Sequence, residues 1–535
     1  MVDPSAALPT DIEALHALIR AERSTLTSVV AARDAAIAER DQLAARNAKL
    51  ERLIAEIRRA HFGRKSERID DDQLALALEE LETAIAKDEA KDEKADPDLK
   101  LEHARKRRAS RALNIEHLPH EEVVIEPESK SCPCCSGTLH VIGEDTSRRL
   151  DKIPAKVRVI VTRRPKYACR TCTDGVVQAP APPRLIEGGL PTEALVADVV
   201  VSKYADHLPL YRQTQILARH GVRIERSTLA QWVGAAAAEL EPLYNHLVSE
   251  LKRSPKLFAD ETRCPVLDPG RGKTKSGYLW AIARDDRPWG GTEPPAVAYR
   301  YAPGRGKEHA VALLEDFSGV LQVDGYAAYN ELTRAGSAVT LSFCWSHLRR
   351  KFYEIYVGGN APIATEALVR IGKLYAIEAE IRGGAPEVRR AERQARSKPI
   401  VTALKPWFEE SLVKISKSSP LADHIRYGLN HWDGLVLFLD DGRIEIDSNT
   451  VERSIRPLAL TRKNALFAGH DLGGQNWAIA ASFTETCKLN LVDPLAWMTD
   501  VLTKLVNLWP ASRIAELMPW AYAKAITADN SARQS

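Results

Sequence analysis

The sequence predicts a multidomain α/β protein in which helical modules flank a core of alternating strands and helices. Its 535 residues leave room for roughly three to five structural units. Hydrophobic residues make up 44% of the chain and charged residues 27%, the balance of a globular protein with a sizeable core. A stretch of helical spacing precedes alternating β and α patterns, and this order is typical of an α/β core with helical additions.

The composition excludes a membrane-spanning protein. No run approaches the roughly 18 to 20 uninterrupted apolar residues of a membrane span. The N-terminus also lacks the basic start and apolar stretch of a secretion signal. We therefore expect a cytoplasmic protein with no membrane partner.

Residues 11–68 carry a heptad pattern that predicts a leucine-zipper-like coiled coil. The row that starts at Leu15 and the companion row from Ile19 are apolar at nine of 13 positions. A seam with this period is best buried against a second helix, and Asn47 within it favours an identical partner. Because Arg33 and Arg40 interrupt the seam, packing on the same chain stays an alternative to homodimerisation.

Charge is unevenly distributed after this helix, although the whole chain has a formal charge of only +3. Residues 69–99 contain 12 acidic residues and three lysines, whereas residues 100–111 contain six Lys or Arg and one Glu. Such tracts usually stay solvated, so we expect an acidic linker and a basic arm over residues 69–112. Contact of the arm with nucleic-acid phosphates is the less favoured alternative.

Two C-x-x-C pairs predict a zinc-binding ribbon over residues 115–178. Cys132 pairs with Cys135 and Cys169 with Cys172, and the segment between the pairs has the β-branched alternation of a long hairpin. Four thiolates from two tight turns suit the tetrahedral coordination of a structural Zn²⁺. Disulfides are the alternative, which a reducing cytosol disfavours. The scattered cysteines are expected to be small buried residues: Cys264, Cys344 and Cys487.

The helical pattern over residues 190–247 contains a candidate helix-turn-helix. One helix is expected to end at Gly221, and a second to start from Ser227, a good N-cap residue. Leu229 and Trp232 of the second helix would pack inward. The side chains offered to a DNA groove would be Arg226, Thr228 and Gln231. Helical hairpins are common in proteins that never touch DNA, so a purely structural hairpin stays an alternative.

Two short apolar runs each end in an aspartate. The run KLFAD ends at Asp260 and GVLQVD at Asp324, with two more strands and a helix expected between them. If the two strands are neighbours, both carboxylates meet at one end of the sheet. A third acid, Glu452, is expected on a helix capped by Asp447 or Ser448.

Three carboxylates from two strands and a helix would form an oxygen-only site that suits Mg²⁺ or Mn²⁺. Two such ions roughly 3.5 to 4 Å apart activate a water or a 3′-hydroxyl and stabilise the leaving oxygen of a phosphodiester. The three acids together therefore point to cleavage and joining of nucleic acid. Taken singly, each acid also fits an ordinary turn, a solvated strand end or a helix-surface pair.

With these residues in view, the chain resembles the transposases of the insertion-sequence-66 family, the TnpC-type DDE transposases of bacteria. The resemblance covers nearly the whole length. The blocks that carry it are HFGRKSER, CPCCSGTLHVIGED to YACRTC, ADET, VDGYAAYN, CWSHLRRKF, DSNTVERSIRPLALTRKNALFAG and TCKLNLVDPLAWMTDVL. Two positions depart from the family pattern: Ser448 stands where Asn is usual, and Ser346 where Ala is usual.

The resemblance implies a ribonuclease-H-like catalytic domain over residues 250–470, with a helical insertion at about 356–440, and a helical C-terminal domain over residues 471–535. It assigns Asp260, Asp324 and Glu452 as the DDE triad. The implied reaction is metal-dependent cleavage at the element's terminal inverted repeats, followed by attack of the freed 3′-hydroxyl on target DNA. Small accessory proteins of the same element are implied partners.

Basic residues near the expected triad are candidates for holding DNA phosphates, because Arg and Lys position DNA without reading its sequence. The candidates are Arg349, Arg350, Lys351, Arg453, Arg456, Arg462 and Lys463. About half of them are expected to be solvated or paired with acids instead. The residues expected to serve packing or hydrogen bonding rather than DNA are Trp345, His347 and Trp477.

The leading hypothesis is a DDE transposase that binds double-stranded DNA ends through its zinc and helical modules and acts as a homodimer or larger assembly. Such a protein would lie on the nucleoid when bound to DNA. One alternative is a non-catalytic DNA-binding relic or regulator, against which the intact triad positions count. The other is a nuclease of the same fold without strand transfer, which would use the same metals.

Overall fold

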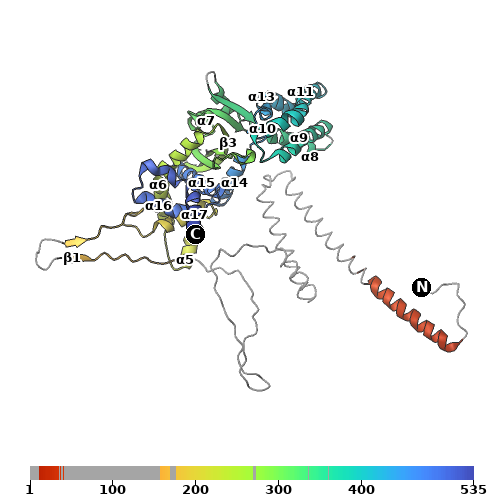
Figure 1. Cartoon of the computed structure of the whole chain (residues 1–535), viewed down its shortest axis with the longest axis horizontal. Coiled ribbons are helices and arrows are strands. Elements are labelled where there is room, and N and C mark those ends of the chain that lie inside the picture. Colours follow the sequence, from red (N-terminus) through yellow and green to blue (C-terminus); the bar gives the residue numbers. More distant parts are fainter. Residues whose placement is uncertain are drawn as a thin grey trace, which may run out of the picture. The chain divides into compact units, whose positions relative to one another are not determined.

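The computed structural model describes residues 11–34, 157–168, 176–268, 273–334, 337–359 and 361–534, together with residues 37 and 40. The chain divides into two compact units, Met1–Arg149 and Leu150–Ser535. In the first unit, residues 12–34 form a helix, red in Figure 1. Ile19 and Leu26 of the heptad seam are exposed on it. The rest of the heptad pattern, apart from residues 37 and 40, and the charged segment at 69–112 lie outside the described residues.

The second unit is mostly helical and is built around a five-stranded mixed sheet (Figure 1). β1 (Lys166–Ala168) and β2 (Val176–Gln178) pair with each other in a separate two-stranded sheet. The strands of the five-stranded sheet are β3 (Lys256–Asp268), β4 (Lys273–Arg284), β5 (Ala296–Ala302), β6 (Gly319–Val323) and β7 (Val339–Phe343). The helices before and within the sheet are α4 (Glu193–Tyr204), α5 (Leu210–Arg219), α6 (Arg226–Lys252), η1 (Arg287–Trp289), α7 (Lys307–Leu314) and η2 (Ala327–Thr333).

After β7 the chain is helical throughout its described elements. The next helices are α8 (Trp345–Val357), α9 (Pro362–Ile381), α10 (Pro386–Glu392), η3 (Arg393–Ser397), α11 (Lys398–Val413), α12 (Pro420–Asn430), α13 (Trp432–Val436) and η4 (Leu437–Leu439). The last are α14 (Asn449–Ala465), α15 (Asp471–Leu489), α16 (Pro494–Val506), η5 (Ala511–Leu517) and α17 (Pro519–Gln534). Among the described helices, none has the length and apolar character needed to cross a bilayer.

The sheet has the order β5-β4-β3-β6-β7. β5, β4 and β3 pair antiparallel, while β3, β6 and β7 pair parallel. The expectation that Asp260 ends its strand was wrong. The chain keeps pairing with β4 from Asp260, opposite Ala281, to Asp268, opposite Lys273, so β3 is one arm of a long hairpin. β7 is a further strand that the sequence patterns did not indicate.

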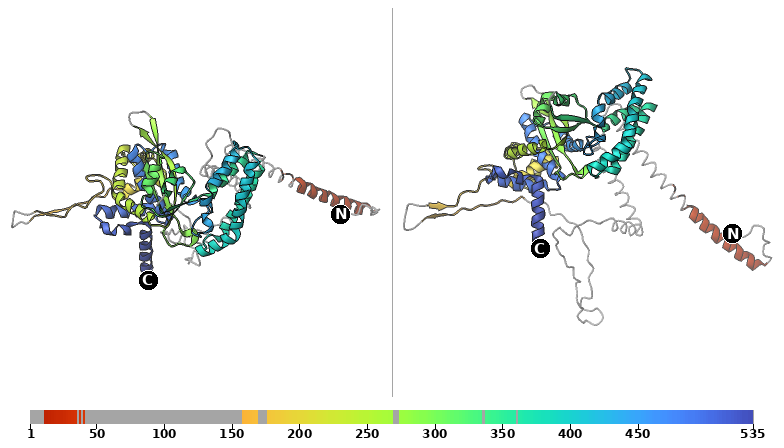
Figure 2. Two further views of the ribbon diagram at one scale, coloured as in Figure 1. Left: turned by 90° about the horizontal axis from the view of Figure 1, so that it is seen from above. Right: turned by 45° about the horizontal axis from the view of Figure 1, so that its top comes forward.

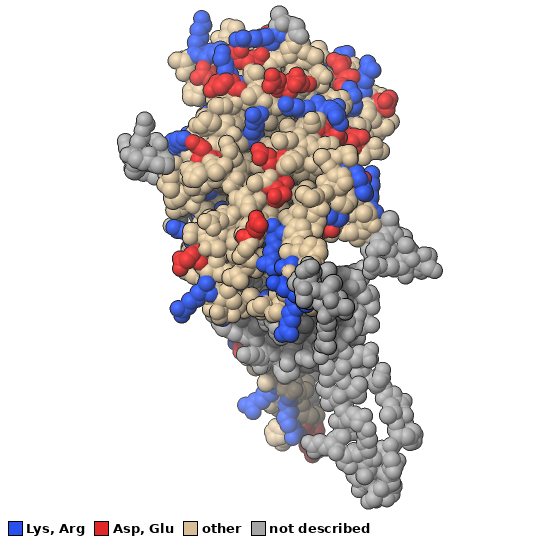
Figure 3. Space-filling model, turned by 90° about the vertical axis from the view of Figure 1, so that its left-hand side faces the viewer, with Lys and Arg blue, Asp and Glu red and all other residues tan. Residues whose placement is uncertain are grey.

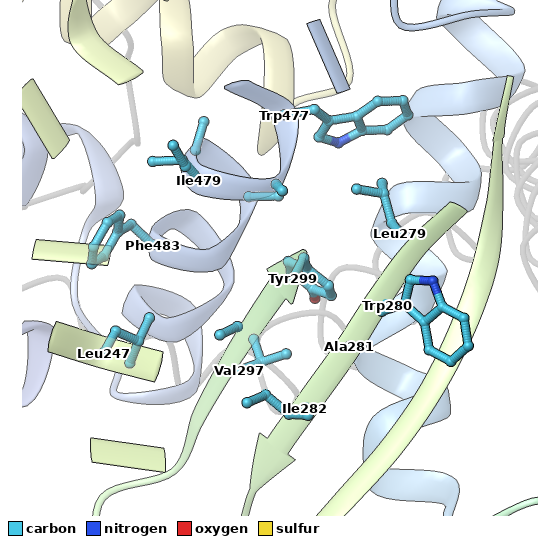
Figure 4. Packing of buried hydrophobic residues seen from close by; sticks show 14 of the residues in the cluster. Leu247, Leu279, Trp280, Ala281, Ile282, Val297, Tyr299, Trp477, Ile479 and Phe483 are labelled. Atoms are coloured by element: carbon cyan, nitrogen blue, oxygen red, sulfur yellow. The ribbon is translucent and has the colours of Figure 1, made fainter. Parts of the chain in front are cut away.

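Side-chain alternation gives the sheet two faces, and different helices cover each one. Ala281 pairs with Tyr299 and lies on the face where Tyr299 bonds to α14 and α15. Figure 4 shows side chains of α6, β4, β5 and α15 meeting in this core. Trp280 is one residue away on β4 and points to the other face, where its ring meets Tyr329 of η2 edge-on at 5.9 Å.

Helices α8 to α13 form a second hydrophobic core beside β7 (Figure 2). Trp345 is fully buried in it, as expected, and its indole nitrogen donates to the carbonyl of Leu435 at 2.8 Å. Trp477 of α15 is buried in the first core, also as expected. Cys264, Cys344 and Cys487 are buried free cysteines, which confirms their assignment as small buried residues.

The candidate helix-turn-helix corresponds to α5 and the start of α6. Gly221 closes α5 with a positive φ of 81°. The expected N-cap was wrong: α6 begins at Arg226, with Glu225 at the cap position and no side-chain capping bond. Leu229 and Trp232 are buried, as expected. The helix runs on to Lys252, because its later turns are also apolar on one side and pack against the sheet.

Candidate active site

Asp260 lies in β3, and Asp324 directly follows β6, the adjacent parallel strand. Phe258 of β3 is in register with Gln322 of β6, and each aspartate comes two residues later on its strand path. The two carboxylates are therefore expected opposite one another, which is the arrangement that the two apolar runs predicted. β6 ends at Val323, so Asp324 begins the following turn, and its Oδ1 accepts the backbone N–H of Tyr326 at 2.7 Å.

Glu452 lies in the first turn of α14, a helix that packs against β3 and β4. Asp260 pairs with Ala281, so its side chain is on the sheet face that α14 covers. Of the two expected caps, Asp447 accepts the N–H of Asn449 at 3.2 Å, whereas Ser448 makes no capping bond. Ser448 instead donates its hydroxyl to Oε1 of Glu452 at 3.3 Å. The helix start thus fixes the carboxylate of Glu452.

Electrostatics link the three acids. Burial raises the pKa of Asp260 well above its ordinary value, and the negative charges of Asp324, Glu261 and Glu452 raise it further. The backbone N–H of Glu261, which donates to Asp260 Oδ1 at 2.8 Å, acts in the opposite direction. A buried carboxyl close to other acids favours either a proton or a nearby cation.

Glu261 is a buried acid that the sequence analysis did not single out. Its side chain is fully buried on the opposite face from Asp260, where it pairs with Arg305 and accepts the hydroxyl of Tyr329 at 3.0 Å. The guanidinium of Arg305 stacks over Tyr326, 3.9 Å from the ring centroid. Because Glu261 follows Asp260 directly, period-two alternation in the strand would have placed it on that other face.

The turn after Asp324 needs a glycine. Gly325 has a φ of 98°, and a Cβ there would lie 2.6 Å from the hydroxyl of Tyr427 and 3.1 Å from Nε2 of His431. The hydroxyl of Tyr427 donates to the carbonyl of Asp324. Residues of α12 and the turn after it therefore cover this side of the site, although they lie about a hundred positions away in sequence.

A second group of donors surrounds Glu452. Single donor atoms of Cys344, His347 and Glu452 lie within 4.8 Å of one another. His347 Nδ1 is 3.6 Å from Glu452 Oε1, and the Sγ of Cys344 accepts the N–H of Ser448 at 3.2 Å. From the sequence, His347 was expected to serve packing or hydrogen bonding, and Cys344 to be a small buried residue. The C-x-x-H spacing in CWSH, directly before a basic helix, was the signal that could have identified them together.

The basic candidates differ in their surroundings. Arg349, Arg350, Arg453, Arg456 and Lys463 are exposed, whereas Lys351 is half-buried with its amine 4.5 Å from the ring centroid of Tyr427. Arg350 lies 3.7 Å from Glu354. Arg462 donates to the hydroxyl of Thr262 at 3.1 Å and to the carbonyl of Arg263 at 2.7 Å. Arg462 therefore holds α14 against β3.

The predicted DNA-reading side chains lie at the start of α6. Arg226 and Gln231 are exposed and Thr228 is half-buried. The loop before α5 contacts α14, because His207 Nδ1 lies 2.8 Å from the hydroxyl of Thr461 and Asn464 donates to the carbonyl of His207 at 3.0 Å.

The zinc-ligand candidates lie outside the described residues: Cys132, Cys135, Cys169 and Cys172.

Comparison with known families gives four matches along the chain. The model described as "Transposase IS66 family" matches residues 188–476, and the "IS66 C-terminal element" matches residues 482–520. The "zinc-finger binding domain of transposase IS66" matches residues 129–173, which include both cysteine pairs. A model described as "Transposase C of IS166 homeodomain" matches residues 49–123.

The chain is also similar to full-length proteins of Sinorhizobium fredii. It is 46% identical to the uncharacterized protein y4qI, over 98% of this chain and 99% of that protein. It is 46% identical to the uncharacterized protein y4jD, over 87% and 93% of the two chains, and 36% identical to y4hP, over 90% and 89%. With a family match over more than half of its length and relatives along nearly all of it, the chain belongs to the IS66 transposase family.

Proposed function

We propose that this protein is a DDE transposase that cuts the ends of its element and joins the freed 3′-hydroxyl to target DNA. Membership of the family supports a transposase role. The observation that carries the catalytic assignment is the environment of Asp260, a half-buried carboxyl beside the strand that leads to Asp324, whose pKa is raised by desolvation and by the charges of Asp324, Glu261 and Glu452. Clusters of this kind are typical of catalytic sites.

The sheet supports a ribonuclease-H-like core. Counted within the sheet, its strands follow the order 3-2-1-4-5, with the first three antiparallel and the last two parallel to the first. In this arrangement the first strand is central and carries Asp260, and the fourth strand beside it leads to Asp324. The helix with Glu452 packs over the first strand. We therefore assign Asp260, Asp324 and Glu452 as the triad.

The donor set fits a divalent cation. The assigned ligands are carboxylate oxygens, which Mg²⁺ and Mn²⁺ prefer, and mutual repulsion of their charges disfavours an empty ionised site. Bound ions of this kind would supply activation of a water or 3′-hydroxyl and stabilisation of the leaving oxygen. The protein's own contribution is to shield the carboxylates partly from solvent, to fix the spacing of the two aspartates through the parallel register, and to hold Glu452 through Ser448.

Basic side chains near the triad would hold the DNA backbone. Those proposed for phosphate contact are Arg349, Arg350, Lys351, Arg453, Arg456 and Lys463. They come from α8 and α14, the two helices that begin beside the acids. We assign Arg462 to positioning α14, since its guanidinium is bonded to β3. Binding of the terminal repeats is assigned to the zinc ribbon, with Cys132, Cys135, Cys169 and Cys172 as ligands, and to Arg226, Thr228 and Gln231.

The test is an assay with the purified full chain and plasmid target DNA in Mg²⁺ or Mn²⁺, run on two labelled ends: one uncut, and one already cut to expose its 3′-hydroxyl. We expect joined product from the wild type and none from Asp324→Asn. Hydrolysis of uncut ends without any joined product would identify a nuclease instead. Binding of ends with neither cleavage nor joining would identify a DNA-binding relic or regulator.

A further inference from the structure

The start of α8 and the segment that leads into α14 are bonded to each other. The backbone N–H of Trp345 donates to the carbonyl of Ile446 at 3.1 Å, and the N–H of Ser448 donates to the Sγ of Cys344 at 3.2 Å. α8 follows β7, which is parallel to β6 and in register with it up to Val323 opposite Phe343. This junction therefore lies at the same end of the sheet as Asp324.

His347 lies at this junction with one ring nitrogen turned inward. Its Nδ1 is buried and has no hydrogen-bond partner within the part of the chain that the structure describes. Oε1 of Glu452 is the carboxylate oxygen beside this nitrogen, at 3.6 Å. A buried polar atom without a partner is destabilising, so a small approach of the two groups into hydrogen-bond distance is favourable.

The same oxygen of Glu452 is held from a second side. The hydroxyl of Ser448 donates to Oε1 at 3.3 Å. With Oε1 held by the protein, Oε2 is the oxygen that remains to act as a ligand. Carboxylates that bind metals are commonly oriented in this way by a hydrogen bond to one oxygen.

We propose that His347 is a positioning residue for Glu452: its Nδ1–H donates to Oε1 and fixes the orientation in which the other oxygen binds a divalent cation. The inference rests on the proposed function, because it takes Glu452 as the third acid of the triad. The competing interpretation is a separate metal site formed by Cys344, His347 and Glu452. The geometry favours positioning, since Cys344 is 1% exposed and its sulfur already accepts a backbone N–H.

The experiment measures thermal unfolding of the full chain over a series of Mn²⁺ concentrations, because a ligand that binds only the folded state raises its melting temperature. We expect His347→Ala to need roughly 10- to 100-fold more Mn²⁺ than the wild type for the same rise. His347→Asn carries an N–H near the place of Nδ1 and should restore most of the response. His347→Gln carries its N–H near the place of Nε2 and should not. A purely structural role for the ring would not separate these two amides.

His309 is the matched control. Its Nε2 lies 3.4 Å from a carboxylate oxygen of Glu308, and its side chain is 22% exposed, compared with 28% for His347. His309→Ala should therefore keep the wild-type Mn²⁺ response. Glu452→Gln should lose most of it, since that change removes the charge of a ligand.

The outcomes separate this inference from the proposed function. If Glu452→Gln loses the Mn²⁺ response and His347→Ala keeps it, His347 does not position Glu452. If Glu452→Gln itself responds like the wild type, Glu452 is no ligand and the triad assignment fails together with the inference. Binding of Co²⁺ with a thiolate absorption band that Cys344→Ser abolishes would replace positioning by the separate metal site. Selective rescue by His347→Asn supports the inference.

Discussion

Asp260 and Glu261 are neighbours in sequence, yet their carboxylates serve opposite faces of the sheet. Asp260 lies on the α14 face, where burial, followed by the charges of the neighbouring acids, raises its pKa. Glu261 is paired with Arg305 on the other face. Period-two alternation separates the two roles, so a change at one position has a different consequence from a change at the other.

The raised pKa of Asp260 predicts a stability effect that depends on pH. A carboxyl whose pKa is higher in the folded state favours folding below its unfolded pKa, and this contribution is lost as pH rises through the folded pKa. Without Mg²⁺ or Mn²⁺, Asp260→Asn should therefore melt a few degrees above the wild type near pH 7, and the difference should shrink as pH falls toward 4. Melting curves from pH 4 to 8 measure it. A difference that does not depend on pH would contradict the argument.

Replacement of two arginines on α14 should affect different properties: protein stability for Arg462 and DNA binding for Arg453. Arg462→Ala removes the bonds to Thr262 and Arg263 and should lower stability by about 1 kcal/mol. Arg453 is exposed on the same helix, and Arg453→Ala should leave the melting temperature unchanged while weakening DNA binding for all sequences, with a salt slope smaller by about one. Melting curves and salt-dependent end binding measure both. An unchanged salt slope for Arg453→Ala would remove that residue from the DNA surface.

At the scale of elements, the sequence predicts the individual strands and helices of the site better than the contacts between them. The runs before Asp260 and Asp324 are recognisable strands because their apolar residues and terminal acid are contiguous. The length of β3 beyond Asp260 depends on pairing with β4, which a local pattern does not contain. The contact of His347 with Glu452 joins helices that are separated by α9 to α13, so no spacing in the sequence reveals it.

The helices between α8 and α14 are held by a buried ion-pair cluster. Glu378 bonds Arg393 at 2.7 Å and Arg389 at 3.3 Å, and Arg389 also reaches Glu445 at 2.8 Å. The backbone of Glu445 is in turn held by the side chain of Gln322 on β6. The cluster thus joins α9, α10 and η3 to the segment that leads to Glu452.

Removal of one partner from this cluster should be costly. Glu378→Gln leaves buried guanidinium charge without its carboxylate and should lower the free energy of unfolding by about 3–5 kcal/mol. Glu380→Gln is the control, since Glu380 lies on the same helix but pairs with Arg396 on the surface, and it should leave the free energy of unfolding nearly unchanged. Denaturant unfolding of the two variants measures the comparison. Equal effects would mean that the buried cluster is not a stabilising junction.

At the scale of the whole molecule, positive charge is not concentrated on one broad surface of the face shown in Figure 3, where basic and acidic side chains are interspersed. This agrees with a formal charge of only +3. The proposed function assigns DNA affinity to local sets of basic residues on α8, α14 and the start of α6, together with the zinc ribbon. Screening by salt should be correspondingly strong for end binding.

Loss of the proposed zinc ligands should impair end binding without impairing Mn²⁺ binding at the proposed triad. Cys132→Ser with Cys169→Ser removes one proposed ligand from each C-x-x-C pair and should release zinc and weaken end binding. The proposed triad lies in another part of the chain, so the Mn²⁺ response of the melting temperature should persist. Metal analysis and end binding of the double variant measure these effects. Retained zinc stoichiometry would contradict the ligand assignment.

The most direct test of the account is a mobility assay in cells with a marked element, comparing the wild type with Asp260→Asn, Asp324→Asn and Glu452→Gln. Each change removes charge and keeps size, and protein level and end binding are checked for each variant. The account predicts that all three abolish transposition and keep end binding, because the carboxylates serve chemistry alone. Normal transposition by any one variant would contradict its place in the triad.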